Sequence, residues 1–458
     1  MSKKQMHINV NILSSGSHGA SWRANEGNPL GYIQIEHYQE IAKVAERGLL
    51  DAVFLADALA ISFNPGTHPS WALDPAVIVA GMAAVTSRIG FIATASTTFS
   101  HPYNIARSFS SLDHISHGRV GWNVVTTYDE RAAGNFGELH LPQHADRYAR
   151  AAEFVDVVQG LWDSWEDDAL ILDRSSGRFA DTGKIHAINH AGTHFTVSGP
   201  LQIPRSPQGR PVLVQAGSSE QGRDLAARYA EAVFSVQQDL AQAKSYYADV
   251  KQRAARYGRN PDQISILPGL FVIVAATEEE ARQRRKALDE IAGEDSVLAR
   301  FAGQLGLDPA DLDLDRPIPE RLLPIINNYM GTRGFVEATL SLARNRSLTV
   351  RDIIARGGGA HRLVVGSPQQ IADTMEQWVA EGAADGFNIM CDVFPSGLAA
   401  FVDLVIPELQ KRGLFRREYT GGTLRDHYGL PRPASRFAGK AAGEGPEDNG
   451  NGLWEVAL

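Results

Sequence analysis

Residues 101–127 read HPYNIARSFSSLDHISHGRVGWNVVTT and pass from a helix-length segment, through a glycine, into a strand that ends in polar residues. Four apolar residues of the first part recur at helical spacing: Ile105, Phe109, Leu112 and Ile115. Gly118 is a natural helix stop. Residues 119–127 then mix apolar bulk with small polar groups, as a strand does when its end lines a pocket. The stretch therefore predicts one helix and one strand of an α/β barrel.

Strands and helices alternate along the rest of the chain, which is typical of a parallel sheet. Eight segments have the composition of strands: 7–13, 52–57, 89–97, 119–127, 211–217, 232–236, 265–276 and 387–394. Helical patterns separate them, among them 38–50, 74–86, 144–165 and 219–229. Eight strand candidates in this order favour a (β/α)₈ TIM barrel over an open sheet.

Two segments are too long for barrel connections, whose loops usually run about two to six residues. Residues 166–210 have the pattern of hairpins, and 294–360 carry helical patterns and an acidic run. We predict one barrel domain over residues 1–430, with both segments inserted over the mouth at the carboxyl ends of the strands. For 294–360, whose charge makes it a poor core, an oligomer contact is an equal alternative. The composition of the tail, 431–458, predicts a disordered or loose arm.

The composition excludes several functional classes. A net charge of -9 without a basic stripe argues against nucleic-acid binding. The single cysteine, Cys391, excludes an internal disulfide framework and a thiolate metal cluster, and its apolar neighbours predict a buried strand thiol. The first residues contain no apolar segment of signal-peptide length, and no run of about eighteen apolar residues occurs. We expect a soluble cytoplasmic protein with no membrane partner.

Polar residues at the ends of the predicted strands are the candidates for chemistry, because the reactive site of a barrel lies where its strands end. They are Asp57, Thr94, Asn123, Ser218 and Ser219. Gly217, Ser218 and Ser219 head a predicted helix and offer free backbone N–H groups, two hydroxyls and a helix dipole, which suit a phosphate monoester. The alternative is ordinary capping, with Ser218 and Gln221 as a capping box, and the residues alone favour it.

In its motifs SLDHIS and GWNVVT, with Gly118 and Arg119 between them, the chain resembles the flavin-dependent monooxygenases of the bacterial-luciferase superfamily. More narrowly, it resembles the branch with nitrilotriacetate, EDTA and dibenzothiophene-sulfone monooxygenases. The resemblance covers residues 7–430. It implies a two-component monooxygenase: a separate NAD(P)H:flavin reductase supplies reduced FMN, and O₂ is the co-substrate that oxygenates a small organic molecule, often with C–N or C–S cleavage. A homodimer or homotetramer is expected.

Transferred position by position, the resemblance implies a set of FMN contacts: Asp57, Thr94, His144, Tyr148 and Ser219, with Ser218 in the same phosphate cradle. His144 and Tyr148 stand at i and i+4, so one helix face can present both to a ligand while Phe154 and Val158 pack inward. By itself such a pair is more often at the surface, and Asp57 could equally cap a turn. One departure is His117, at a predicted helix end where a small residue such as glycine is usual; we expect no loss of function from it.

We expect His101, Asn123 and His144 near the flavin ring, because proton transfer needs a group that titrates near neutrality and histidine is the usual one. The substrate-side candidates are His18, Trp22 and His68, although loop residues of these types are more often at the surface. The segment 294–360 is expected to close over the mouth, with hinges at 331–334 and 357–359. Its contacts are expected to be with substrate and solvent rather than with the phosphate cradle.

Other chemistries find weaker support in the sequence. The 14 histidines include no His-x-His after the first strand and no Glu-x-x-His pair, so no metal site is predicted. The glycines at 357–359 do not form a dinucleotide-binding motif, and there is no Gly-x-Ser-x-Gly elbow. Two alternatives remain open: an oxidoreductase of the same superfamily that uses a deazaflavin, and a non-catalytic flavin-binding protein on the same barrel.

Overall fold

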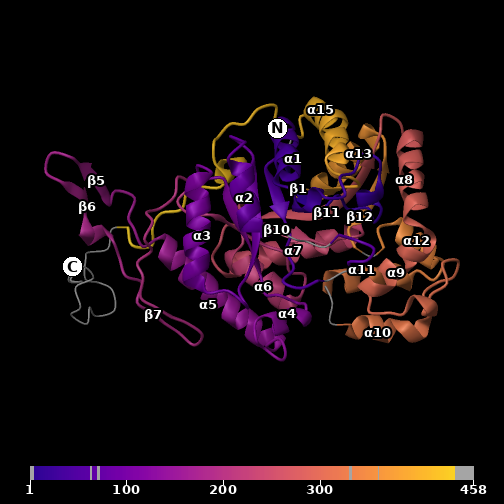
Figure 1. The fold of residues 1–458 in the computed structure, drawn as a ribbon, viewed down its shortest axis with the longest axis horizontal. Helices are drawn as coiled ribbons and strands as arrows, with labels where there is room; N and C mark the ends of the chain where they lie inside the picture. Colours follow the sequence, from indigo (N-terminus) through magenta and orange to yellow (C-terminus); the bar gives the residue numbers. More distant parts are fainter. Residues whose placement is uncertain (1–4, 62–63, 70–72, 330–332, 359, 439–458) are drawn as a thin grey trace.

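A closed barrel of parallel strands forms the centre of the protein, and the computed structural model describes residues 5–61, 64–69, 73–329, 333–358 and 360–438. Around the barrel the strands are β1 (His7–Ile12), β2 (Ala52–Leu55), β3 (Gly90–Ser96), β4 (Val120–Val125), β9 (Val212–Gln215), β10 (Ala232–Ser235), β11 (Ser265–Val274) and β13 (Gly386–Cys391). β13 pairs with β1 and β10 pairs with β11, which closes the sheet. These eight strands are the eight predicted segments, so the (β/α)₈ barrel is confirmed (Figure 1).

A ninth parallel strand, β12 (Arg362–Gly366), is not predicted by the sequence. β10 pairs with Ser265–Pro268 of β11, and β12 pairs with the later half of that strand, Leu270–Val274. The long β11 therefore continues past the barrel and carries β12 on the same edge. This arrangement places the residues that precede β12 near the carboxyl ends of the barrel strands.

Helices surround the strands (Figure 1). They are α1 (Ile35–Arg47), α2 (Pro75–Ala83), α3 (Pro102–Ile115), α4 (Arg131–Asn135), α5 (His144–Trp162), α6 (Glu220–Tyr229), α7 (Leu240–Arg256), α8 (Glu278–Ala292), α13 (Pro368–Ala380), α14 (Ser396–Ala400) and α15 (Ile406–Lys411). A π-helical turn at Phe401–Val405 joins α14 to α15. Asp74 caps α2, since its carboxylate accepts hydrogen bonds from the backbone N–H groups of Ala76 and Val77.

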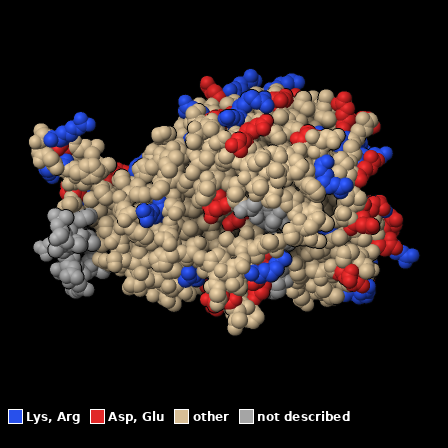
Figure 2. All heavy atoms as spheres, in the orientation of Figure 1, with Lys and Arg blue, Asp and Glu red and all other residues tan. Residues whose placement is uncertain are grey.

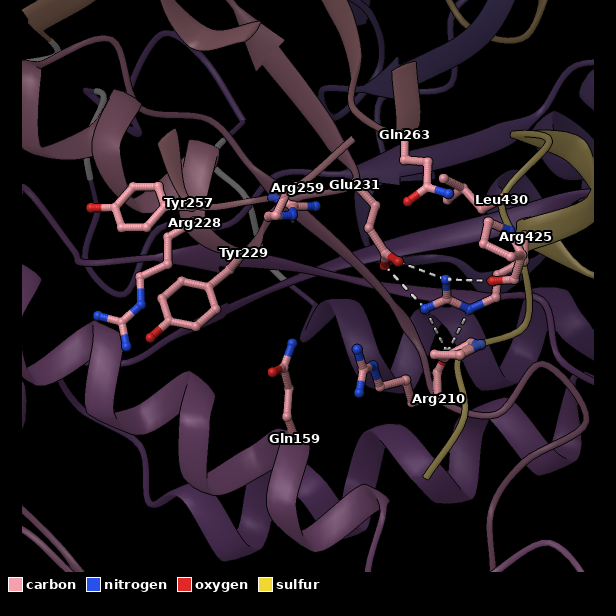
Figure 3. A pocket seen from close by; sticks show the side chains of 12 residues that line it. Gln159, Arg210, Arg228, Tyr229, Glu231, Tyr257, Arg259, Gln263, Arg425 and Leu430 are labelled. Atoms are coloured by element: carbon pink, nitrogen blue, oxygen red, sulfur yellow. Dashed lines mark hydrogen bonds and ion pairs between the residues drawn. The ribbon is translucent and has the colours of Figure 1, made fainter. Parts of the chain in front are cut away.

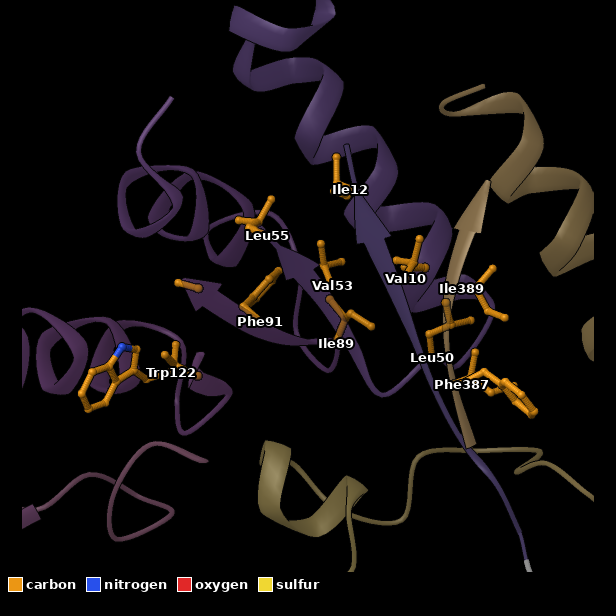
Figure 4. Close-up of a cluster of buried hydrophobic side chains, with 14 of the residues drawn as sticks. Val10, Ile12, Leu50, Val53, Leu55, Ile89, Phe91, Trp122, Phe387 and Ile389 are labelled. Atoms are coloured by element: carbon orange, nitrogen blue, oxygen red, sulfur yellow. The ribbon is translucent and has the colours of Figure 1, made fainter. Parts of the chain in front are cut away.

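The main hydrophobic core lies between the strands and the outer helices. Alternate strand residues point outward into it, as Val10, Val53 and Phe91 do in Figure 4. On β4, Trp122 is fully buried, with its ring 5.8 Å from that of Phe154. Because side chains alternate along a strand, the residues between these point into the barrel.

Two buried charged residues of the opening stretch hold it in place: Asp113 joins α3 to β4, and Arg119 joins the start of β4 to the end of α2. The Asp113 carboxylate accepts hydrogen bonds from Val120 N at 3.0 Å and from Gln208 Nε2 at 2.8 Å. Arg119 is 2% exposed and its guanidinium donates to four backbone carbonyls, those of Ala83, Thr86, Ile89 and Ser116. Besides its predicted apolar stripe, the stretch thus contains buried charged residues that stabilise its turn. The prediction is wrong for Ile115, which is 56% exposed.

The amino-terminal end of the barrel is closed by α16 (Leu424–His427) and the residues after it. Leu424, Tyr428 and Leu430 are buried in one cluster with Phe54 of β2 and its neighbours on other strands. The Tyr428 hydroxyl donates to Asn9 Oδ1 at 2.9 Å. This end is a packed floor, so the opposite end, where the strands finish, is the mouth.

The first part of the predicted loose arm, 431–438, is docked on the protein. The Arg432 guanidinium pairs with the Asp167 carboxylate at 2.6 Å, and the Ser435 hydroxyl donates to the Asp163 carbonyl at 2.9 Å. The prediction of a loose arm is wrong for these residues, because polar groups of the 166–210 region hold them. The rest of the arm lies outside the described residues.

The segment 166–210 forms two hairpins, as predicted. The prediction that it covers the mouth is wrong for the first hairpin, and the turn of the second only reaches the start of α3, where Phe195 meets His101. The hairpins are β5 (Leu170–Asp173) with β6 (Arg178–Ala180) and β7 (His190–Ala191) with β8 (Thr196–Val197). The segment joins the carboxyl end of α5 to the amino end of β9, and both lie at the floor. Gln208 accordingly donates to the carbonyl of Val120, at the start of β4, and His190 contacts Glu153 on the outside of α5. In Figure 1, β5 and β6 extend away from the barrel beyond α3.

The segment 294–360 lies at the mouth and is helical. It contains α9 (Glu294–Gln304), α10 (Leu323–Asn328), α11 (Arg333–Arg344) and α12 (Val350–Ala355). Ser341 accepts a hydrogen bond from Gln242 at 2.6 Å and the Ala360 carbonyl accepts one from Gln238 at 2.9 Å, and both glutamines follow the carboxyl end of β10.

This segment has an apolar core of its own, contrary to the prediction from its charge. Its acidic residues lie outside, where Figure 2 shows Asp and Glu gathered along the right edge over α9 and α12. Of the expected hinges, 331–332 and 359 lie outside the described residues, and Gly334 lies within α11. The buried core includes Phe301, Leu305, Ile318, Leu322 and Val350.

Candidate active site

Two of the predicted site residues form a hydrogen-bonded pair inside the barrel. Thr94 and Asn123 are direct neighbours on β3 and β4, and Asn123 Nδ2 donates to Thr94 Oγ1 at 2.8 Å. Both side chains are buried. Asn123 Oδ1 has no hydrogen-bond partner among the residues that the structure describes. A buried acceptor without a donor is costly, so this oxygen is available to a ligand.

Two further asparagines in the barrel have unsatisfied atoms and are not singled out by the sequence reasoning. Asn11 Oδ1 on β1 and both polar atoms of the Asn388 amide on β13 are buried and make no hydrogen bond within the described part of the chain. The alternation of inward and outward side chains along a strand could have identified them. Asn11 stands between Val10 and Ile12, and Asn388 stands between two outward-facing apolar residues. An asparagine at an inward position of a barrel strand is a candidate ligand contact.

A row of aromatic rings crosses the barrel and reaches the helical insertion. Phe54 of β2 meets Phe234 of β10 edge to face at 5.3 Å, and the His361 ring stacks on Phe234 at 4.9 Å. His361 also meets Phe335 of α11 at 5.6 Å. Burial lowers the pKa of His361 to about 4, so its imidazole is neutral at pH 7. A Cβ at Gly269 would lie 2.1 Å from His361 Nδ1, so this glycine leaves the space that the ring fills.

Asp57 follows the carboxyl end of β2, as predicted. Burial, with the charge of Asp74 as a second cause, raises the pKa of Asp57 to about 6. Its carboxylate accepts a hydrogen bond from the backbone N–H of Ala58, which opposes the rise. A carboxyl group with this pKa exchanges a proton close to neutral pH, as groups in active sites often do.

His144 and Tyr148 share one face of α5, with ring centroids 4.8 Å apart. Phe154 and Val158, further along the helix, are fully buried, so the predicted orientation of α5 is confirmed. Burial and the charge of Arg147 lower the pKa of His144, so its imidazole is neutral at neutral pH.

The predicted phosphate cradle is built from the amino ends of two helices. Ser219 caps α6, accepting a hydrogen bond from Gly222 N at 3.1 Å, so the cap is not the Ser218–Gln221 box. A Cβ at Gly334, near the start of α11, would come within 2.8 Å of Ser218 Oγ. The prediction that segment 294–360 keeps away from the cradle is therefore wrong. Two helix amino ends at one serine favour an anion.

The three substrate-side candidates occupy loops after the first two strands. His18 is buried, and its Nε2 lies 3.1 Å from Asp289 of α8. The indole N–H of Trp22 is buried without a partner among the described residues. The ring Nδ1 of His68 lies 2.6 Å from the carbonyl oxygen of Pro69, and burial is the largest cause that lowers its pKa. None of the three is a freely exposed side chain.

His101 lies apart from the buried polar groups of the barrel. It is exposed at the start of α3, where its Nδ1 accepts a hydrogen bond from Tyr103 N at 3.3 Å. Its ring also meets that of Phe195, on the outer hairpin, at 6.3 Å. The structure thus gives this histidine a capping role.

A cavity of about 430 Å³ lies at the floor end, on the far side of the barrel from the mouth (Figure 3). Of the four arginines in its wall, three pair with acidic residues, and Arg259 donates to backbone carbonyls. Arg425 forms two hydrogen bonds with Glu231, at 2.6 and 3.0 Å, and Arg210 pairs with Asp163 at 3.1 Å. The first pair joins α16 to the residue before β10, and the second joins the end of α5 to the segment before β9, so we assign this cavity a structural role.

The comparisons with known proteins agree with the geometry. A sequence profile of the family described as luciferase-like monooxygenase matches residues 10–385. Nitrilotriacetate monooxygenase component A of Aminobacter aminovorans is 46% identical over 450 residues, which cover 95% of this chain and 98% of the relative. N-acetyl-S-(2-succino)cysteine monooxygenase of Bacillus subtilis (strain 168) is 44% identical over 442 residues, which cover 95% and 99%.

Among solved structures, a riboflavin lyase crystallised with modified FMN and riboflavin superposes with a TM-score of 0.83 at 32% identity. The match covers 97% of this chain and 100% of that one. The family profile thus covers the barrel from β1 to the residue before β13, and the two relatives cover 95% of the chain. The chain belongs to the family of luciferase-like monooxygenases.

Proposed function

We propose that the protein is the oxygenating component of a two-component monooxygenase that uses reduced FMN and O₂. The observation that carries the proposal is that relatives named as monooxygenases match this chain over nearly its whole length. One of them is named as component A, which supports a separate component here. That partner is a NAD(P)H:flavin reductase, since the sequence has no dinucleotide-binding motif.

The residues at the mouth fit FMN at both of its ends. The phosphate suits Ser218 and Ser219, where the amino ends of α6 and α11 meet. The edge of the flavin ring carries hydrogen-bond donors and acceptors, which suit the unsatisfied amide oxygen of Asn123. We propose that Asp57, Thr94, His144 and Tyr148 complete the cofactor site.

The protein contributes orientation, exclusion of water and proton transfer. When bound, reduced FMN supplies the electrons that activate O₂. The neutral imidazole of His144 can accept a proton, and Asn123, fixed by Thr94, orients the ring edge. Of the residues expected near the flavin ring, His101 is the weakest candidate for a catalytic role, because it caps α3 on the outside. Helices α9 to α12 lie at the mouth and are the part of the fold suited to keep water out.

The test is reconstitution. With NADH and oxidised FMN alone, the purified protein should oxidise no NADH, and addition of an unrelated flavin reductase should start substrate-dependent O₂ consumption and product formation. Direct oxidation of NADH by the protein alone would contradict the two-component proposal. An enzyme that uses a deazaflavin would oxidise the reduced deazaflavin without consuming O₂, and a flavin-storage protein would bind FMN without forming product.

A further inference from the structure

One arginine at the mouth has no counter-ion among the residues that the structure describes. Arg300 lies on α9, half-buried, and makes no hydrogen bond or ion pair with any residue in the described ranges. The internal segments outside those ranges contain no Asp or Glu. Burial lowers the pKa of its guanidinium, yet arginine stays charged in proteins. A desolvated charge without a partner is costly, so a ligand that neutralises it would be bound strongly.

Arg300 lies between the loops that follow β1 and β2. A Cβ at Gly19 would come within 3.1 Å of its Nη1, so the guanidinium lies against the backbone of the loop after β1. Its charge is one of the causes that lower the pKa of His68, in the loop after β2. The sequence-based substrate candidates belong to these same two loops.

Two carboxylates of the adjoining elements are paired with other cations. Asp289 of α8 contacts His18 at 3.1 Å and Arg285 at 2.7 Å. Glu26, in the loop after β1, pairs with Arg284 at 2.9 Å. The protein thus neutralises the neighbouring cations and leaves Arg300 without an acidic partner among the residues described.

Two more unsatisfied groups stand in the loop beside Gly19. The indole N–H of Trp22 and the hydroxyl of Ser17 are buried, and neither has a partner within the described ranges. Ser17 is 8% exposed. A guanidinium, an indole N–H and a hydroxyl are a set of hydrogen-bond donors, which matches an acceptor-only group such as a carboxylate.

This donor set is distant from the phosphate cradle. In the order of strands around the barrel, β2, β3 and β4 separate β1 from β9 on one side, and β13, β11 and β10 separate them on the other. The loop that carries Ser17 and Gly19 therefore stands on the opposite rim from Ser218. One FMN phosphate cannot serve both places, so an anion bound at Arg300 would belong to another molecule.

We propose that Arg300, with the Trp22 indole and the Ser17 hydroxyl, binds a carboxylate of the substrate, so that the protein acts on small organic acids. The inference rests on the proposed function, which makes the mouth an oxygenation site. A neutral hydrocarbon or sulfide would leave the guanidinium unpaired, and an ester would lack the negative charge.

The test compares acids with their neutral esters. Thiodiacetate, iminodiacetate, succinate and glutarate, each beside its dimethyl ester, are titrated into the protein by calorimetry. At least one acid should bind about 30-fold or more tightly than its ester. Arg300→Gln should lower the affinity for that acid by about 30-fold and leave the ester unchanged, whereas Arg300→Lys should retain most of it. Arg316→Gln is the matched control, since Arg316 lies on the same insertion with its side chain 81% exposed.

Three results would overturn the inference: no acid binds more tightly than its ester, Arg300→Gln binds the acid as the parent does, or Arg300→Gln weakens reduced FMN instead of the acid. A thermal midpoint close to that of the parent shows that the variant is folded. The proposed function is judged separately, by anaerobic titration of reduced FMN into the parent protein. Failure of the parent to bind reduced FMN would contradict the proposed function, while the acid–ester comparison, made without FMN, would still decide the role of Arg300.

Discussion

The backbone of Gly334 lies against the hydroxyl group of Ser218, so that a Cβ added to the glycine would come within 2.8 Å of Ser218 Oγ. Gly334 belongs to α11 of the insertion, and Ser218 precedes α6 at the end of β9. The insertion therefore forms one wall of the proposed phosphate cradle. Its position and the affinity for the cofactor should be coupled.

Gly334→Ala tests this coupling. The new methyl group would press on Ser218 and on Val236, whose Cβ would be 3.2 Å away, so either the hydroxyl or α11 must move. We expect reduced FMN to bind about tenfold more weakly, a cost in the usual range for overpacking. Anaerobic titration of reduced FMN measures it. Gly303→Ala, in α9 with open space around the position, is the control and should leave the affinity unchanged.

Ser219→Ala and Tyr148→Phe test the remaining phosphate contacts. Each should weaken reduced-FMN binding by about 1–3 kcal/mol, because a charged phosphate would lack one hydrogen bond. Ser219→Ala also removes the cap of α6, so Ser367→Ala, which removes the cap of α13, controls for lost helix stability. If both cradle variants bind FMN as the parent does, these residues lie outside the site.

Asp57 should make stability depend on pH. Its pKa of about 6 in the folded protein exceeds the ordinary value near 3.9, so the folded chain retains a proton that the unfolded chain releases. The contribution of Asp57 to the free energy of unfolding therefore falls as pH rises from about 4 to about 6. The free energy of unfolding of Asp57→Asn, relative to the parent, should rise between pH 5 and pH 7 in urea denaturation of the FMN-free protein. A difference that does not change with pH would contradict the assignment.

His117 has a φ of 59°, which explains why a glycine suits this position. His117→Gly should raise the free energy of unfolding by about 0.5–1 kcal/mol without changing turnover, because the exposed imidazole makes no contact with the mouth. Gly118→Ala is the opposite change: φ is 88°, and the Cβ would lie 3.0 Å from a Thr423 methyl group. It should destabilise the protein, and equal stability of both variants would refute the backbone argument.

The barrel could be predicted from the sequence because each of its eight strands is a short apolar run between helical patterns. β12 could not, since its RLVVG is brief, only half-buried and preceded by glycines. Where 166–210 begins and ends was predictable in principle, because a segment between a helix and the next strand must start and finish at the floor. Ile115 fits the helical stripe, but it stands at the last residue of α3 and reaches solvent.

The candidate site could be predicted in part. Thr94 and Asn123 end neighbouring strands, so sheet geometry brings them together. Gly334 and Arg300 could not be found in this way, because they come from an insertion whose position over the mouth depends on tertiary packing. No local pattern shows that a glycine touches a serine more than a hundred residues earlier.

The floor of the barrel comes from residues that are synthesised after all eight strands. On the ribosome, β1 to β13 emerge while Leu424 and Tyr428 are still to be made, so the inner layer around Phe54 stays open to water until about residue 430 has left the exit tunnel. This layer is therefore the last part of the barrel to close. A chain stalled between β13 and α16 would present an unfilled apolar interior, which is the kind of surface that chaperones bind.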